Sequence, residues 1–166
     1  MAELIALPVL GALVILQSAL IRQVTVLQGS ADIVMLMVAA WALQPNVRRS
    51  WVWAIVAGIM VGYISSVPLA VWLGGYVSVG LMAAYLRRRA WEAPILGMIL
   101  LAIAGTLIVQ GLAWGALRLL GTPLPLALSL RRVILPGILL NLLFAIPIYS
   151  LANDLATWVF PEALEI

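Results

Sequence analysis

The chain has 166 residues, of which 66% are hydrophobic and 9% are charged, and its net charge is +3. Soluble domains are about 45–50% apolar and about 25% charged, so this composition excludes a soluble domain, a disordered chain and a nucleic-acid-binding domain. Because a membrane-spanning helix needs about 20 apolar residues, the length accommodates about six such helices. The composition predicts an all-α integral membrane protein, a compact bundle of six transmembrane helices forming one domain over residues 1–166.

The residue types that the chain lacks narrow its chemistry. It contains no Cys and no His, which excludes thiol catalysis, iron–sulfur clusters and sites that depend on imidazole. The acidic residues are scattered, so no paired carboxylates for acid–base catalysis or metal binding are visible. They are Glu3, Asp32, Glu92, Asp154, Glu162 and Glu165. We therefore predict a protein that is not an enzyme, with no catalytic residues, no metal and no cofactor.

The first apolar run extends over 18 residues from Leu4 to Ile21 and is closed by Arg22. A signal peptide is the alternative, but the run is too long for the apolar region of one. Glu3 precedes it and no basic residue does. We expect an uncleaved helix over residues 4–21.

Charges, glycines and prolines divide the rest of the chain. Further helices are expected over residues 31–44, 51–65, 68–86, 93–117 and 133–153. The segment 119–130 contains Gly121, Pro123 and Pro125 and is expected to lie along the membrane interface rather than to cross. Six helices is the preferred number, and five is the alternative because the second run is weak.

That second run is too short to cross a bilayer. Its 13 residues from Ala31 to Leu43 would extend ~20 Å as a helix, against a hydrocarbon core of ~30 Å. Either the bilayer thins locally, or residues 23–30 enter the membrane under a cover of protein, or the boundary is misplaced.

Arginine and tryptophan positions predict the orientation. On a six-helix path, five Arg residues fall in loops on one side and four on the other, and the triplet 87–89 occupies a very short loop. Because short cytoplasmic loops are enriched in basic residues, the side with the triplet is expected to be cytoplasmic. Tryptophans near helix ends support two aromatic belts. Those on the cytoplasmic side would be Trp41, Trp51, Trp53, Trp91 and Trp158, and those towards the outer side would be Trp72 and Trp114. Both termini are therefore predicted to be cytoplasmic.

Small residues recur at four-residue spacing, which allows close approach of helix backbones in a membrane. The steps are Ala54-Gly58-Gly62, Gly80-Ala84 and Gly111-Gly115. Packing within the bundle is the favoured interpretation, and contact with a partner helix is the alternative.

Few polar side chains interrupt the apolar runs. The amides Gln17, Gln110 and Asn141 would act as hydrogen bonds between helices or, alternatively, line a polar pocket. Arg22 and Asp32 flank the short second run and are expected to pair. Pro136 and Pro147 are expected to kink the last helix and to free carbonyl groups.

Two segments resemble the rod shape-determining protein MreD family. The sequence Ser-Ala-Asp-Ile-Val-Met-Leu at 30–36 resembles that family's Pro-Asp-Leu-x-Leu motif. The stretch 58–69, with paired glycines and a closing Pro68-Leu69, resembles its Gly-x-x-x-Gly-Leu-x-x-Asp and Pro-Leu-Gly motifs. Asp32 is retained, whereas Ala31 replaces the family's Pro, Ala70 its Gly, and Ser65 or Ser66 its second Asp.

The resemblance implies a non-catalytic scaffold of the bacterial cell-elongation complex (the elongasome), located in the cytoplasmic (inner) membrane. Such a scaffold binds MreC directly and works with RodA, MreB and a class B penicillin-binding transpeptidase, supporting lateral peptidoglycan synthesis and cell shape. A homodimer is left open. The residues expected to serve packing or partner binding are Arg22, Asp32, Gly58, Gly62, Pro68, Arg131 and Arg132.

The family's architecture is similar to that of the S-components of energy-coupling-factor transporters, so the alternative function is vitamin capture by such a component. A vitamin pocket needs several convergent polar groups beside its apolar lining. Gln17, Gln110 and Asn141, with Arg22 and Asp32, are the few residues that could supply them.

Overall fold

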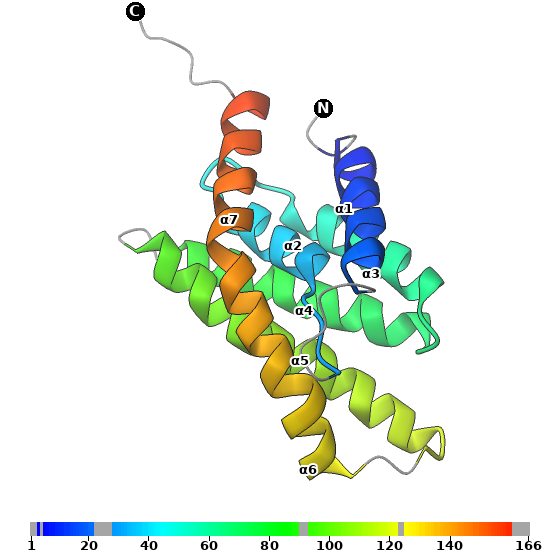
Figure 1. Cartoon of the computed structure of the whole chain (residues 1–166). Coiled ribbons are helices and arrows are strands. Elements are labelled where there is room, and N and C mark those ends of the chain that lie inside the picture. The colour runs from blue at the N-terminus through cyan, green and yellow to red at the C-terminus, as the bar shows by residue number, and fades with distance from the viewer. Residues whose placement is uncertain (1–2, 4, 22–27, 90–92, 123–124, 161–166) are drawn as a thin grey trace, which may run out of the picture.

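The computed structural model describes residues 3, 5–21, 28–89, 93–122 and 125–160. Within these residues the protein is all-α, and its helices follow one another in the order shown in Figure 1. They are α1 (Ala6–Ile21), α2 (Ile33–Leu43), α3 (Ser50–Ile64), α4 (Leu69–Arg87), α5 (Pro94–Leu119), α6 (Leu126–Ser129) and α7 (Leu135–Val159). A π-helical turn, η1 (Leu130–Ile134), joins α6 to α7, so these three elements form one continuous last helix and the described residues contain six helices.

Three of the six helices are long and apolar enough to cross a membrane. They are α4, α5 and the last helix, Leu126–Val159, whereas α1, α2 and α3 are apolar but shorter. The chain therefore has the helices of a multi-pass membrane protein, as its composition predicts.

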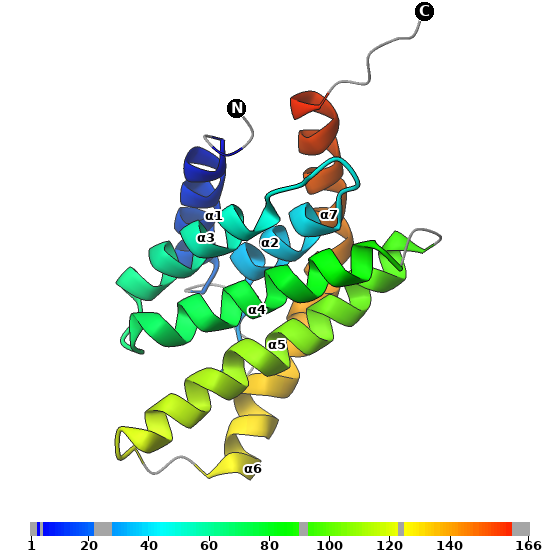
Figure 2. The same cartoon turned by 180° about the vertical axis from the view of Figure 1, so that it is seen from behind.

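Helix α2 forms the centre of the bundle. All 11 of its residues are buried, and it packs against α1, α3, α4, α5 and α7. The other helices surround it in both views of the ribbon (Figures 1 and 2). A helix of this length extends only ~16 Å, yet it needs no match to the bilayer thickness because protein covers it on every side.

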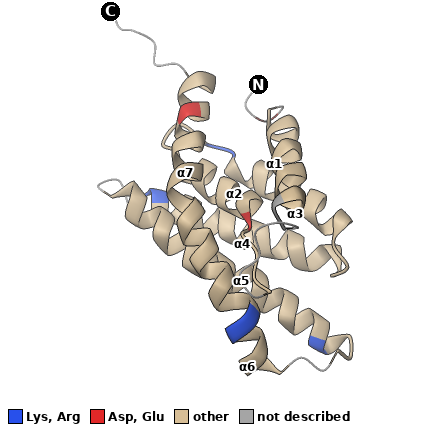
Figure 3. Ribbon diagram, in the orientation of Figure 1, with Lys and Arg blue, Asp and Glu red and all other residues tan. Residues whose placement is uncertain are grey.

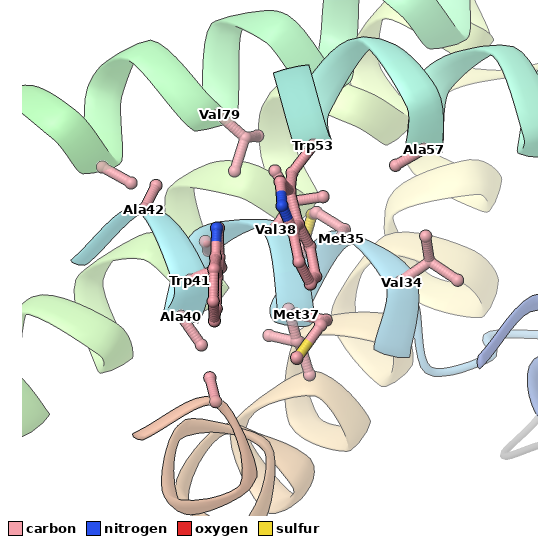
Figure 4. Close-up of a cluster of buried hydrophobic side chains, with 14 of the residues drawn as sticks. Val34, Met35, Met37, Val38, Ala40, Trp41, Ala42, Trp53, Ala57 and Val79 are labelled. Carbon is pink, nitrogen blue, oxygen red and sulfur yellow. The ribbon is translucent and has the colours of Figure 1, made fainter. Parts of the chain in front are cut away.

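Tryptophan placement differs from the predicted aromatic belts. Trp41 and Trp53 are each 1% exposed and stack face to face, with ring centroids 4.3 Å apart and an interplanar angle of 19° (Figure 4). They belong to the core between α2 and α3, so they give no evidence of a membrane interface. Trp51 and Trp158 are 52% and 73% exposed, as belt residues are, and Trp91 lies outside the described residues.

The glycine step in α3 packs inside the bundle against α4. A Cβ atom on Gly58 would lie 2.8 Å from the Cα of Leu73, and one on Gly62 would lie 3.2 Å from the Cα of Leu69. A side chain at position 58 would force the backbones apart, and one at position 62 would be tightly crowded, so α3 and α4 pack closely at this step. In contrast, a Cβ atom on Gly111 or Gly115 of α5 would meet no atom within 4 Å.

The loops and chain ends gather at two opposite ends of the bundle. At one end, Arg49 forms a 3.3 Å ion pair with Glu3, and the ring of Phe160 lies 6.4 Å from that of Trp41, near the end of α2. At the other end, the segment 28–32 meets the last helix, since the Gln28 N–H donates to the Arg132 carbonyl at 3.0 Å. These contacts are compatible with a six-helix path in which successive loops lie at alternate ends of the bundle.

The Arg87 side chain has a structural role in the Arg-rich loop. Its guanidinium donates to the carbonyls of Ala42, Gln44 and Val47, just where α2 ends. A cation at a helix C-terminus satisfies unpaired carbonyls and interacts favourably with the helix dipole. Arg87 therefore caps α2, while Arg88 and Arg89 are exposed.

The segment 119–130 differs from its expected form. Helix α5 continues to Leu119, and the last helix begins at Leu126, seven residues before the predicted start at 133. Pro125 occupies the N-cap position of that helix, and prolines are well tolerated at helix starts because no backbone N–H is needed there. Of the stretch between these helices, the described residues are 120–122 and 125.

Candidate functional site

Asp32 organises the start of the central helix. Its Oδ1 atom accepts a hydrogen bond from the Met35 N–H at 2.9 Å, which caps α2, and another from the Tyr76 hydroxyl of α4 at 2.7 Å. An acidic side chain at a helix N-terminus satisfies a free N–H group and faces the positive end of the helix dipole. The carboxylate is thus stabilised inside the bundle by hydrogen bonds and by the helix itself.

Two of the predicted amides cap the same helix from neighbouring elements. Asn141 of α7 accepts from the Asp32 N–H at 2.7 Å, and Gln17 of α1 accepts from the Val34 N–H at 3.0 Å. The Asn141 amide also donates to Thr106 of α5 at 2.7 Å, and Asn141 is fully buried. Side chains of α1, α4, α5 and α7 therefore converge on the beginning of α2.

The segment 28–32 is clamped against the last helix at its π-helical turn. Pro136 has no N–H to donate to the Arg132 carbonyl four residues earlier, and the Gln28 N–H donates to that carbonyl at 3.0 Å. Gly29 is required for this approach, because a Cβ there would lie 2.7 Å from both the Val133 oxygen and the Gly137 nitrogen.

A pocket of about 450 Å³ lies beside this segment. Its walls come from the end of α1, residues 28–32, the facing ends of α3 and α4, the second half of α5, and the last helix around η1. Most of the lining is apolar, including Val61, Ile64, Val109, Leu128 and Ile134. Polar groups reach it from Gln17, Ser30, Asp32, Ser65, Gln110 and Ser129.

Two buried polar atoms on the pocket wall have no hydrogen-bond partner among the residues that the structure describes. They are the indole Nε1 of Trp72 and the side-chain Oε1 of Gln110. Trp72 is held at a ring-centroid distance of 6.2 Å from Tyr76, which bonds Asp32. Gln110 is held beside Gly137, where a Cβ would lie 2.7 Å from its Nε2. One unpaired donor and one unpaired acceptor therefore belong to residues that line the same pocket.

Some of the predicted site residues line the pocket and others do not. Asp32, Gln17 and Gln110 come together at the pocket, and Asn141 lies behind it in the hydrogen-bond network without lining it. Arg22 lies outside the described residues, so its expected pair with Asp32 stays a prediction.

The remaining predicted residues lie away from the pocket. Pro68 occupies the N-cap position of α4, and Gly58 and Gly62 join α3 to α4. Arg131 and Arg132 are exposed on η1, at the end of the bundle opposite the termini (Figure 3).

Sequence reasoning missed Tyr76 and Thr106, and it predicted Trp72 as a residue of the outer aromatic belt but not as part of a pocket. A signal for Tyr76 existed, because a tyrosine inside an apolar run needs a partner for its hydroxyl, and Asp32 was the nearest unexplained acid. Thr106 bonds both Asn141 and the Ala102 carbonyl. Nothing in the sequence distinguishes it from the surrounding core.

Comparison of the chain with models of known protein families, with curated proteins and with solved structures gives no match. Within the described residues, no group of three or more acidic side chains that could hold a metal ion occurs.

Proposed function

We propose that this protein is an MreD-like, non-catalytic scaffold of the bacterial cell-elongation complex, which binds MreC in the cytoplasmic membrane. In this role it links MreC to RodA, MreB and a class B penicillin-binding transpeptidase and supports lateral peptidoglycan synthesis. The proposal rests on the residues that resemble the MreD motifs and on what they do in the fold.

The observation that carries the proposal is the position of those motifs. The first, residues 30–36, opens the central helix, and its retained acid Asp32 caps α2 and binds Tyr76. The second, residues 58–69, brings α3 and α4 into backbone contact through Gly58 and Gly62. Both motifs thus build the bundle, which suits a family whose members act by holding partners together.

Ser65 or Ser66 stands where the family has its second Asp, and the hydrogen bond of Ser65 in the turn before α4 is compatible with this departure. The Ser65 Oγ atom accepts a hydrogen bond from the Val67 N–H at 3.1 Å. Asp makes the same turn with a carboxylate oxygen, and Ser makes it with its hydroxyl. Ser65 can therefore replace the family's Asp as far as this turn is concerned.

The bundle surface suits a partner with a single membrane-spanning helix. Large apolar side chains are exposed along α5 and α7, and charged residues are absent from the described middle parts of both helices. These side chains include Leu100, Leu107, Leu112, Leu139, Leu143 and Ile146. Lipid or an apolar helix such as that of bitopic MreC would cover them.

Orientation belongs to the same proposal. Arg48, Arg49, Arg88 and Arg89 are exposed at the end of the bundle where the described chain ends lie, and the positive-inside rule assigns that end to the cytoplasm. Arg118, Arg131 and Arg132 are exposed at the opposite end, which would face the periplasm and there offer charges to acidic partner residues or lipid phosphates.

Co-expression with MreC from the same genome tests this function. The parent protein should copurify MreC in stoichiometric amount, and the double variant Arg131→Glu with Arg132→Glu should retain at least ten-fold less. The matched control is Arg48→Glu with Arg49→Glu, an adjacent exposed pair at the other end, which should retain MreC. Membrane yield checks insertion in each case.

Failure of the parent to bind MreC would refute the scaffold function. Normal binding by the Arg131 and Arg132 variant would show that these charges are not part of the contact.

The pocket favours a second candidate function, which is capture of a small molecule as an S-component of a transporter. It has the mostly apolar lining and few convergent polar groups that small-molecule sites share. In the same purification, a bound vitamin without MreC would favour this function over the scaffold.

A further inference from the structure

We propose that the pocket between residues 28–32, α5 and the last helix binds an uncharged ligand with an apolar body and a hydroxyl or primary amide group. That group accepts a hydrogen bond from the Trp72 Nε1–H and donates one to the Gln110 Oε1. Ligand binding is independent of the scaffold role, because the observations that support it concern the pocket and not the contact with MreC.

The unpaired atoms are the first reason. Folded proteins pair the large majority of their buried polar groups, and an unpaired group carries the full penalty of its desolvation. Here two such atoms, one donor and one acceptor, border one cavity. A hydroxyl or amide both accepts and donates, so one such group between Trp72 and Gln110 would satisfy both.

The rigidity of the two side chains is the second reason. The Trp72 ring packs on Tyr76, whose hydroxyl is fixed by Asp32, and Gln110 is confined by the backbone of Gly137. Their polar atoms are held in place before any ligand arrives. Preorganised groups of this kind lose little conformational entropy on binding.

The charge of the lining selects an uncharged ligand. Asp32 is the one charged side chain among the described residues that line the pocket, and its Oδ1 already accepts from Met35 and Tyr76. Among these described residues an anion would find no cation, and its charge would lie among Val61, Ile64 and Ile134. A cation would find only the Asp32 carboxylate among the described lining residues, and that group already accepts two hydrogen bonds.

The volume fits a small molecule or the polar end of a lipid. About 450 Å³ lies within the range of ~300–1,000 Å³ that is common for small-molecule sites. A neutral lipid with free hydroxyls and a soluble aromatic amide present the same chemistry to Trp72 and Gln110. Experiments with both kinds of probe separate these two sources.

The test uses the full chain extracted in styrene–maleic acid nanodiscs, because sugar detergents carry hydroxyls that would compete. The probes are 1-monooleoylglycerol for the lipid source and benzamide for the soluble source, with methyl oleate as the control that cannot donate. We expect one of the first two probes to raise the Tm of the parent by ~3–5 °C, whereas methyl oleate leaves it unchanged.

Variants link the shift to the pocket. Ala113→Trp fills it and should abolish the Tm shift, while Leu112→Trp, on the exposed face of the same helix, should keep it. Trp72→Phe replaces the indole by a smaller aromatic ring that has no N–H, so the probe should bind at least ten-fold more weakly. Its own Tm without probe reports whether it folds, and Gln110→Leu serves as the second variant if it does not.

The inference is overturned if neither probe shifts the Tm of the parent, or if folded Trp72→Phe and Gln110→Leu bind the probe as the parent does. MreC copurification is measured on the same preparations. Loss of probe binding in Ala113→Trp with MreC retained would show that the two functions fail independently.

Discussion

Replacing Asp32 by Ala should lower the free energy of unfolding by ~2–5 kcal/mol, the sum of a lost helix cap and a buried hydroxyl left without its partner. The cap is the bond to the Met35 N–H, and the hydroxyl is that of Tyr76. Chemical unfolding in detergent measures the change. Asp154→Ala, an exposed acid in α7, is the control and should remain within ~0.5 kcal/mol of the parent.

A double-mutant cycle sharpens this result. Tyr76→Phe removes the hydroxyl that donates to Asp32, so much of the penalty of Asp32→Ala should disappear in the Tyr76→Phe background. Fully additive losses would contradict the proposed coupling between these side chains.

Replacing Gly58 by Leu should prevent α3 and α4 from packing. The nearest atom to a Cβ at this position is the Leu73 Cα at 2.8 Å, which is backbone and cannot rotate away. Overpacking costs ~1–3 kcal/mol or more in a well-packed core, and here the two backbones must separate. We expect a large loss of folded protein, measured as monodisperse yield and Tm.

Gly111→Leu is the matched control, because nothing lies within 4 Å of a Cβ at that position. It should leave the yield and Tm unchanged. Equal tolerance of Leu at both positions would mean that α3 and α4 do not meet at Gly58.

Much of the fold follows from the apolar runs. The expected all-α fold and six helices are confirmed, because Arg and Pro residues interrupt the runs near where the helices end. The length of the second run shows that it is too short to cross a bilayer, but its position at the centre of the bundle was not predicted. A helix pairs its own backbone groups in lipid, so nothing in the sequence requires the complete burial that its 11 residues show.

Other features depended on contacts between distant residues. Trp41 and Trp53 stack in the core although their places near helix ends are equally typical of an aromatic belt. The last helix begins at Leu126 and continues through η1 into α7, and the Arg132 carbonyl accepts a hydrogen bond from Gln28, which is far away in the chain. No local pattern predicts such a bond.

The candidate site was predictable only in its polar members. Gln17, Gln110 and Asn141 are conspicuous in apolar runs, and helices α1, α5 and α7 bring them near the start of α2. Trp72 lies near the start of an apolar run, where an indole is typical of an aromatic belt. Its unpaired Nε1 atom becomes apparent only when its surroundings are known.

The six-helix path requires that the two ends of the bundle lie on opposite sides of the membrane. Because the chain contains no cysteine, single introduced cysteines can test this directly. Single variants Asn46→Cys and Thr122→Cys place a thiol at exposed positions on opposite ends of the bundle. In intact spheroplasts, a membrane-impermeant maleimide should label Thr122→Cys at once and Asn46→Cys only after the membrane is opened. Labelling of both positions from the same side would contradict the six-helix path.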